Sequence, residues 1–231
     1  MAQGTLYTPQ SGGLTDLLRT IIDILGGTGT NYGAEPELLE GIILNMQTPI
    51  GVQNNADLFT QPSTCVAATL PRSVAAESIT IATVSGTIYM QAIYIPANTV
   101  VNNITTVTGS TASTNDVTIN WAALCDSGRH VLAVSANATA QLTPAGFNNT
   151  LALTSSFTTT YSGLYYIAYT VGATTTQPTI CGNTAAGTEV AKIAPILCGT
   201  SSTSSTSTPP TTGTQLGAIT ATASSIYQFL T

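Results

Sequence analysis

Charged side chains are scarce in this sequence. Only 6% of its 231 residues are Asp, Glu, Lys or Arg, and Lys and Arg together number 4. Ordinary soluble proteins carry about 25% charged residues. Nucleic-acid binding depends on clustered Lys and Arg that neutralise phosphates, and the sequence contains no such cluster. The composition therefore argues against a nucleic-acid partner, and we expect none.

Long apolar runs are also missing. No run reaches the ~18 residues that a membrane-spanning helix needs, so we expect no membrane partner. Thr, Ser, Asn and Gln take the place of charge, and they give a surface that suits a protein exposed outside a cell or on a particle. Residues 1–13 lack the basic and apolar regions of a secretory signal. A protein with such a surface, made in a host cytoplasm without an export signal, must leave its cell by another route, and release inside a virus particle at lysis is one such route.

The cysteines are few and widely spaced. They are Cys65, Cys125, Cys181 and Cys198. No CxxC pair occurs, which argues against a zinc site or a redox motif. Two disulfide states remain open: four free thiols, as expected for a protein made in a reducing cytosol, or one Cys181–Cys198 bridge. Cys125 falls at the end of a predicted strand, where we expect it to be half buried.

Residue types that commonly carry catalysis are sparse as well. His130 is the single histidine and follows a predicted turn at Asp126–Arg129. Ser127, His130 and Asp126 are the residue types of a Ser-His-Asp triad, but neighbours in one tight turn cannot align nucleophile, base and orienting group. Asp116 and Asp126 bracket one predicted strand, too far apart for a glycosidase carboxylate pair. We expect no enzyme activity, no catalytic, cofactor-binding or metal-binding residues, and no cofactor.

The middle of the chain predicts β-strands separated by turn residues. Trp121, in mid-strand, is the expected core anchor, because its ring is the largest apolar side chain available. Short strands at this spacing are typical of a sandwich or barrel. We predict a mainly β protein in which residues 79–198 form an antiparallel, jelly-roll-like β-sandwich. The predicted strands are Ile79–Val84, Thr87–Ile95, Val100–Val107, Val117–Cys125, Val131–Ala136, Thr150–Thr154, Leu164–Val171 and Thr179–Cys181.

Two amphipathic helices are predicted before the strands. Apolar residues recur at ~100° per residue, Gly26 ends the first helix and Pro49 follows the second. We expect residues 1–48 to form an arm and a helical hairpin that anchors the protein, and residues 49–78 to form an extended connector. Helices this short are marginal alone in water, so their apolar stripes must pack on the chain's own sandwich, a symmetry mate or another protein. The predicted assembly interface comprises Leu14, Leu17, Leu18, Ile21, Ile22, Leu25, Leu38, Leu39, Ile42, Ile43 and Met46.

The C-terminal part changes composition. Residues 199–216 are rich in Ser, Thr and Pro, which predicts a flexible linker. Beyond it, Ala218–Ala221 and Ile226–Leu230 are strand-like. We expect residues 217–231 to return strands to the sandwich or to add them to a neighbour's sheet edge.

Four tyrosines lie close together in sequence. Tyr161, Tyr165, Tyr166 and Tyr169 could form a sugar-stacking platform if they were contiguous on the surface. Alternation along a strand instead divides residues between the two faces of a sheet. A host-surface glycan is therefore an alternative partner.

Four segments resemble a known group of proteins. They are Ile93–Ile104, Asn120–Asp126, Leu132–Ala136 and Ser162–Tyr166. They are similar to a β-sandwich module in virion proteins of tailed bacteriophages, notably those of actinobacterial hosts, which are described as minor tail or head decoration proteins. The resemblance covers about residues 79–183. It implies a β-sandwich fold and homo-oligomers, with a trimer favoured.

The resemblance and the composition together suggest a structural role. We expect a virion protein on the particle surface, a capsid decoration or head-fibre-like subunit that contacts the major capsid protein or other virion proteins. The alternative is a minor tail or receptor-binding protein whose sandwich binds host cell-wall glycan.

Overall fold

The computed structural model describes residues 64–75, 77–80, 86–111, 117–139, 148–174, 176–184 and 192–231, with only the backbone at 73 and 77–80. The chain divides into two compact units, Met1–Val52 and Gln53–Thr231. All described residues belong to the second unit. The predicted helical hairpin, the eleven residues of the predicted assembly interface and Asp116 lie outside the described residues.

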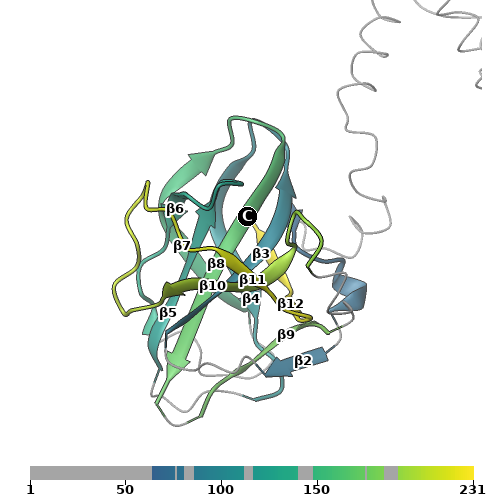
Figure 1. Ribbon diagram of the computed structural model, residues 1–231, viewed down its shortest axis with the longest axis vertical. Helices are drawn as coiled ribbons and strands as arrows, with labels where there is room; N and C mark the ends of the chain where they lie inside the picture. Colours follow the sequence, from purple (N-terminus) through teal and green to yellow (C-terminus); the bar gives the residue numbers. More distant parts are fainter. Residues whose placement is uncertain are drawn as a thin grey trace, which may run out of the picture. The chain divides into compact units, whose positions relative to one another are not determined.

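The regular secondary structure of the described residues is almost entirely strand (Figure 1). A short 3₁₀ helix, η1, spans Arg72–Val74. No helix among the described residues is long and apolar enough to cross a membrane. The strands are β1 (Ala67–Ala68), β2 (Glu77–Thr80), β3 (Thr87–Ile95), β4 (Val100–Val107), β5 (Val117–Cys125), β6 (Val131–Val134), β7 (Asn148–Thr158), β8 (Gly163–Ala173), β9 (Thr179–Asn183), β10 (Cys198–Ser204), β11 (Ile219–Ala221), β12 (Ser225–Ile226) and β13 (Gln228–Leu230).

These strands form three sheets. The largest has six strands in the order β11-β10-β3-β8-β5-β6, the second has four in the order β1-β13-β4-β7, and the third has three in the order β12-β9-β2. Every paired strand runs antiparallel to its neighbour. The six-stranded and four-stranded sheets pack together, so the protein is mainly β and its architecture is consistent with a β-sandwich. The predicted bounds of β3, β4 and β5 are confirmed.

The first hydrophobic core fills the space between the packed sheets. Ile167 and Tyr169 reach it from β8, and Ile104 and Leu151 reach it from β4 and β7. A buried polar contact crosses the same core: the amides of Asn120 and Asn149 donate to each other's oxygens, at 3.3 and 3.1 Å. Because these amides are satisfied by each other, burying them avoids the cost of unpaired polar atoms.

A second hydrophobic cluster lies on the other face of the six-stranded sheet. Trp121, Met90 and Tyr166 belong to it, together with Ile88, Ile119, Ala123, Cys125, Val131, Ala168 and Leu216. Trp121 is 1% exposed, which confirms its prediction as a core residue. Cys125 was predicted to be half buried and is fully buried, because this face of the sheet is covered.

The cover comes from the C-terminal segment. Residues 205–217, which we call the strap, connect β10 to β11 (Figure 1). Trp121 Nε1 donates to the Thr206 carbonyl at 2.9 Å, and Leu216 buries its side chain in the cluster. The Val131 amide donates to the Thr214 carbonyl at 2.9 Å, and the Leu216 amide donates to the Arg129 carbonyl at 3.0 Å.

The prediction of a flexible linker over residues 199–216 is therefore wrong in two respects. Cys198–Ser204 is strand β10, which pairs with β3 and β11 inside the six-stranded sheet. The strap that follows is fixed by backbone hydrogen bonds and by Leu216. The hydroxyl-rich composition predicted a solvated linker because it says nothing about hydrogen-bond partners that lie far away in sequence.

The last strands return to the chain's own sandwich. β13 lies between β1 and β4, β11 pairs with β10, and β12 pairs with β9. Other predicted bounds shift. β7 extends over Asn148–Thr158, beyond the predicted Thr150–Thr154, whereas β6 ends at Val134, two residues before the predicted end. The predicted connector contains β1 and η1 within its described part.

Candidate functional site

The turn that holds the single histidine is exposed. The His130 side chain is 47% exposed, and its Nδ1 lies 3.2 Å from Oδ2 of Asp126. The Asp126 carboxylate also accepts the His130 backbone amide at 2.8 Å. The carboxylate therefore organises the turn. Within the described residues, Ser127 makes no hydrogen bond to His130, so the structure does not bring these three side chains into the line that a triad needs.

All four thiols are free, so the Cys181–Cys198 bridge is absent and the alternative of four free thiols holds. Burial raises the pKa of each thiol above its ordinary value of 9.0, and at Cys125 burial and the neighbouring Asp126 raise it to about 12. These thiols are therefore protonated at neutral pH. Because the thiolate is the reactive form, none of them is prepared to act as a nucleophile. Among the described residues, no group of three or more His, Cys, Asp or Glu side chains could hold a metal ion.

The four tyrosines do not form a common platform. Tyr165, Tyr166 and Tyr169 are buried, with Tyr165 and Tyr169 in the first core and Tyr166 in the second cluster. Tyr161 alone among the four is exposed. It stacks on Tyr165 with ring centroids 4.6 Å apart and donates its hydroxyl to the Leu164 carbonyl. The alternation along β8 therefore divides the tyrosines between two buried faces.

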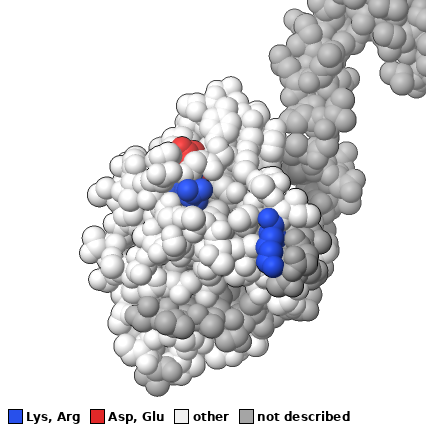
Figure 2. Space-filling model, viewed as in Figure 1, with Lys and Arg blue, Asp and Glu red and all other residues white. Residues whose placement is uncertain are grey.

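The described surface carries little charge. The described side chains include four charged ones, Arg72, Asp126, Arg129 and Lys192. Figure 2 shows that uncharged residues make up most of the described atoms on the face viewed in Figure 1. The Arg129 side chain contacts the strap: its Nε donates a hydrogen bond to the Leu216 carbonyl at 3.2 Å. Weak fields and many hydroxyl groups characterise this surface.

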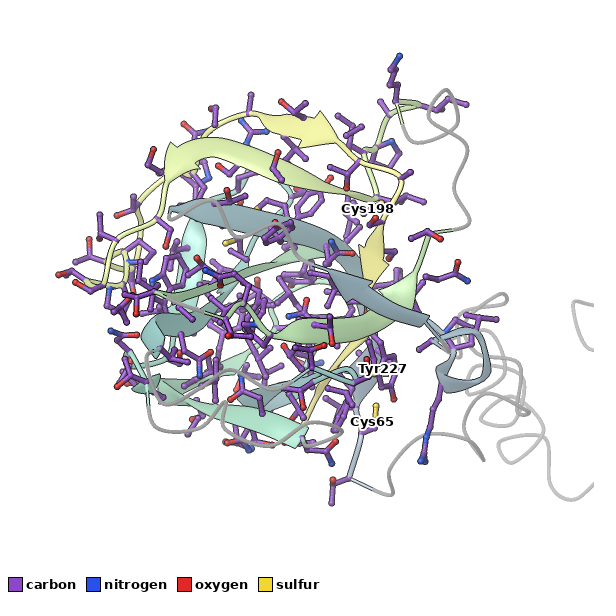
Figure 3. The ribbon with its side chains drawn as sticks, turned by 90° about the horizontal axis from the view of Figure 1, so that it is seen from below. Cys65, Cys198 and Tyr227 are labelled. Atoms are coloured by element: carbon purple, nitrogen blue, oxygen red, sulfur yellow. The ribbon has the colours of Figure 1, made fainter. Side chains whose placement is uncertain are left out.

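One cavity combines aromatic and polar side chains. Its volume is about 390 Å³, and the described residues that line it are Arg72, Ala75, Val107, Asn148, Cys181, Tyr227 and Phe229. The rings of Tyr227 and Phe229 are tilted, with centroids 5.9 Å apart. Burial raises the pKa of Tyr227 to about 12, so its hydroxyl stays neutral. Figure 3 shows Cys65 near Tyr227 and Cys198 apart from both.

The second cavity is smaller and mainly apolar. It has a volume of about 260 Å³ and is lined by Thr69, Leu70, Ala92, Asn183, Leu197, Cys198 and Ser225. Leu197 belongs to residues 192–197, which we call the junction loop because they lead into β10. The Ala92 amide donates to the Leu197 carbonyl at 2.7 Å, and the Tyr166 hydroxyl donates to the Ile196 carbonyl at 3.0 Å. The first bond continues the pairing of β10 with β3, and the second holds the junction loop to Tyr166 of β8.

The segments that carry the resemblance come together in the structure. Ile93–Ile104 contains the end of β3 and the start of β4. Asn120–Asp126 contains the end of β5, Leu132–Ala136 the end of β6 and Ser162–Tyr166 the start of β8. Four of these strands, β3, β8, β5 and β6, are consecutive in the six-stranded sheet. In comparisons with known proteins, no protein-family model matches the chain and no curated protein matches it.

Proposed function

We propose that this chain is a structural protein of a tailed-bacteriophage virion, a capsid decoration or head-fibre-like subunit. The observation that carries the proposal is the placement of the four segments that carry the resemblance: they contribute to β3, β8, β5 and β6, which are consecutive in the six-stranded sheet, and one of them continues into β4 of the four-stranded sheet. A jelly-roll-like sandwich, predicted from the strands of the sequence, is the finer description of the fold that we propose. The role of such a subunit is to add buried contact between capsid proteins or to present an outer surface.

The described surface suits that role. Strand β7 exposes Thr150, Thr154, Ser155 and Ser156, and these hydroxyl groups are solvated without strong charge. A protein with few charged groups makes few interactions that salt would screen. Such a surface would tolerate changes in ionic strength outside a cell.

Attachment is assigned to residues 1–48, with the major capsid protein or other virion proteins as partners and a homo-oligomer, preferably a trimer, as the assembled form. The two predicted apolar stripes support this assignment, because amphipathic helices of this length need a surface on which to pack. The eleven residues of the predicted assembly interface would supply that contact.

Particle binding by the full chain tests the proposal. Replacing Leu18 and Ile22 with Ser should abolish co-sedimentation with phage capsids that lack the protein. A matched variant with Thr15 and Thr20 replaced by Ala, on the opposite side of the same predicted helix, should still bind. If the deletion of residues 1–48 leaves a protein that still decorates particles, the anchoring role is refuted.

A minor tail or receptor-binding protein is the second candidate. The cavity beside Tyr227 and Phe229 favours it, since a concave site lined by aromatic rings and a few polar groups is typical of small-ligand sites. The test is binding of the full chain to purified host cell-wall glycan, with Asn148→Ala as the site variant and Thr154→Ala as the control. Retention of the wild type and the control, but not of Asn148→Ala, would support this candidate.

A further inference from the structure

Two loops at one end of the packed sheets are joined to each other. Residues 96–99 connect β3 to β4 and residues 159–162 connect β7 to β8, and we call them the tip loops. The Asn98 amide donates to the Thr159 carbonyl at 2.8 Å, and the Thr159 amide donates to the Thr99 carbonyl at 3.0 Å. The Thr159 hydroxyl also accepts the Thr99 amide at 2.9 Å. The tip loops are therefore fixed relative to each other and form one surface.

Tyr161, in the second of these loops, presents an aromatic ring whose orientation is fixed. The ring stacks on the buried ring of Tyr165, with centroids 4.6 Å apart, and its hydroxyl donates to the Leu164 carbonyl at 3.1 Å. A Cβ atom at Gly163 would lie 3.0 Å from Cε2 of Tyr161, so the glycine permits the ring to lie against the backbone. The residue nevertheless stays 39% exposed. A ligand would not have to order this side chain, and such ordering is one of the costs of binding.

Asn98, in the first of these loops, presents a side-chain amide to solvent. Its φ is 61°, in the left-handed region that Asn tolerates better than most residues with a Cβ atom. Its side chain is exposed and has no hydrogen-bond partner among the described residues. A side-chain amide both donates and accepts hydrogen bonds, so it can pair with a ligand hydroxyl in either role.

The tip loops are polar but uncharged. Their sequences are PANT and TTYS, and the hydroxyl residues Thr160 and Ser162 are exposed beside Tyr161. Such a surface offers an apolar ring face and neutral hydrogen-bonding groups, so it recognises a ligand that has both and carries no charge. A neutral sugar ring has C–H groups on its faces and hydroxyls around its edge. Tyr and Asn on loops held by a rigid β scaffold are also the residue types that antibody binding loops use.

We propose that the tip loops bind a neutral carbohydrate, with a sugar ring stacked on Tyr161 and sugar hydroxyls hydrogen-bonded to the Asn98 amide. The site is separate from the cavity beside Tyr227, because Asn148 and Val107 line that cavity and lie at the opposite ends of β7 and β4 from the tip loops. The inference does not depend on a place in a virion.

NMR titration of the full chain with defined oligosaccharides tests the inference. The probes are neutral hexasaccharides of glucose, mannose, galactose and N-acetylglucosamine, and the charged comparison is hexagalacturonic acid. The wild type should bind at least one neutral hexasaccharide and bind it more tightly than the acidic one. The absence of binding to every neutral probe, or binding to the acidic probe alone, overturns the inference.

Three variants locate the site. Tyr161→Ala should weaken binding by about tenfold or more, whereas Tyr161→Phe, which keeps the ring, should stay within about threefold of the wild type. Because Tyr161 also covers Tyr165, the alanine variant can lose stability, and the melting temperature of each variant is measured. Asn98→Gly avoids this difficulty, since glycine adopts a positive φ without strain. It should weaken binding about fivefold through the lost amide and leave the melting temperature unchanged.

The matched control is Asn102→Ala, which removes an exposed amide from β4 and should bind as the wild type does. Binding that survives both Tyr161→Ala and Asn98→Gly overturns the inference. If Asn148→Ala loses binding while both tip variants keep it, the sugar lies in the cavity beside Tyr227 and the inference is overturned as well. None of these results bears on the attachment of residues 1–48 to particles, which the co-sedimentation test measures separately.

Discussion

Two regions of the described chain are held in place for different reasons. One is the group of central strands β3, β8 and β5, and the other is the strap. The three strands are apolar on both faces, and β8 is buried along nearly all of its length. Their order follows from the hydrophobic effect, which removes large side chains from water. The strap is mostly Ser, Thr, Pro and Gly, and most of its side chains are exposed. Its order depends on backbone hydrogen bonds to the sheet and on very few buried side chains.

The two regions depend on each other. Without the strap, the face that carries Trp121, Met90 and Tyr166 would be open to water. Without Trp121, the Thr206 carbonyl would lose its donor. A polar segment can therefore protect a hydrophobic sheet when its backbone is fixed at several points. Four substitutions separate the contribution of the sheet from that of the strap.

Trp121→Ala should have the largest effect. It removes the largest fully buried side chain and the hydrogen bond to the strap, and we expect a loss of about 3–5 kcal/mol in the free energy of unfolding. Urea denaturation measures it. Trp121→Phe keeps most of the ring but not the N–H, and should lose about 1–2 kcal/mol. A loss below about 1 kcal/mol for the alanine variant would contradict the dependence of the strap on this face.

Leu216→Ala should have the second largest effect on the free energy of unfolding. Leu216 is the buried apolar anchor of the strap, and truncating it should cost about 2–4 kcal/mol and speed proteolytic cleavage within residues 205–215. Thr212→Ala, at an exposed position of the same segment, should change stability by no more than about 0.5 kcal/mol. Equal cleavage rates for the two variants would show that the backbone bonds alone fix the strap.

Cys125→Ala should change the alkaline stability of the covered face. Burial raises the Cys125 pKa from 9.0 to about 12, so the folded protein favours the protonated thiol. This contribution is complete below pH 9 and is lost as the pH rises toward about 12. Between pH 9 and about 12, the free energy of unfolding of the variant should therefore fall less steeply than that of the wild type. The two slopes should differ by about 1.4 kcal/mol per pH unit.

The measurement for Cys125 is urea denaturation at several pH values. Cys65→Ala is the control, because Cys65 is only partly buried and burial raises its pKa without the added effect of a neighbouring carboxylate. Tyr89 also has a pKa raised to about 12 by burial, so some alkaline loss should remain in every variant. Identical slopes for Cys125→Ala and the wild type would show that the second cluster admits water.

Gly213→Ala should have the smallest effect. Gly213 has a φ of 86° in the strap, and a Cβ there would meet no atom within 4 Å. The cost is therefore backbone strain alone, about 1 kcal/mol. Gly213→Asn should cost less, because Asn tolerates this conformation. If both variants have the same free energy of unfolding as the wild type, the positive φ at position 213 does not strain a residue with a Cβ atom.

Local signals in the sequence were sufficient for part of the fold. The predicted turn at Asp126–Arg129 is confirmed: the Arg129 amide donates to the Asp126 carbonyl at 2.9 Å, and Arg129 has a positive φ of 70°. The bounds of β3, β4 and β5 could be predicted because turn residues lie at their ends and apolar residues lie between them. Trp121 could be predicted as buried because of its size.

The strap and the tyrosines could not be predicted, for a common reason. The partner of Thr206 is Trp121, 85 residues away in sequence, and composition carries no information about such a pairing. Alternation along β8 would distinguish exposed from buried tyrosines only if one face of the sheet were solvated. Since the strap covers Trp121 on that face and the Ile196 carbonyl of the junction loop accepts the Tyr166 hydroxyl there, both faces are buried. Leu216, an isolated apolar residue in a polar stretch, was the one available signal.

The pairing of β13 with β4 has a consequence for the nascent polypeptide. Thr106 meets Gln228, so β4 leaves the ribosome long before the strand that completes its edge. Until then the growing chain presents an unprotected sheet edge and an uncovered tryptophan face, both of which promote aggregation. Slow translation of the middle of the chain would lengthen that interval, and chaperone binding during synthesis would shorten the exposure.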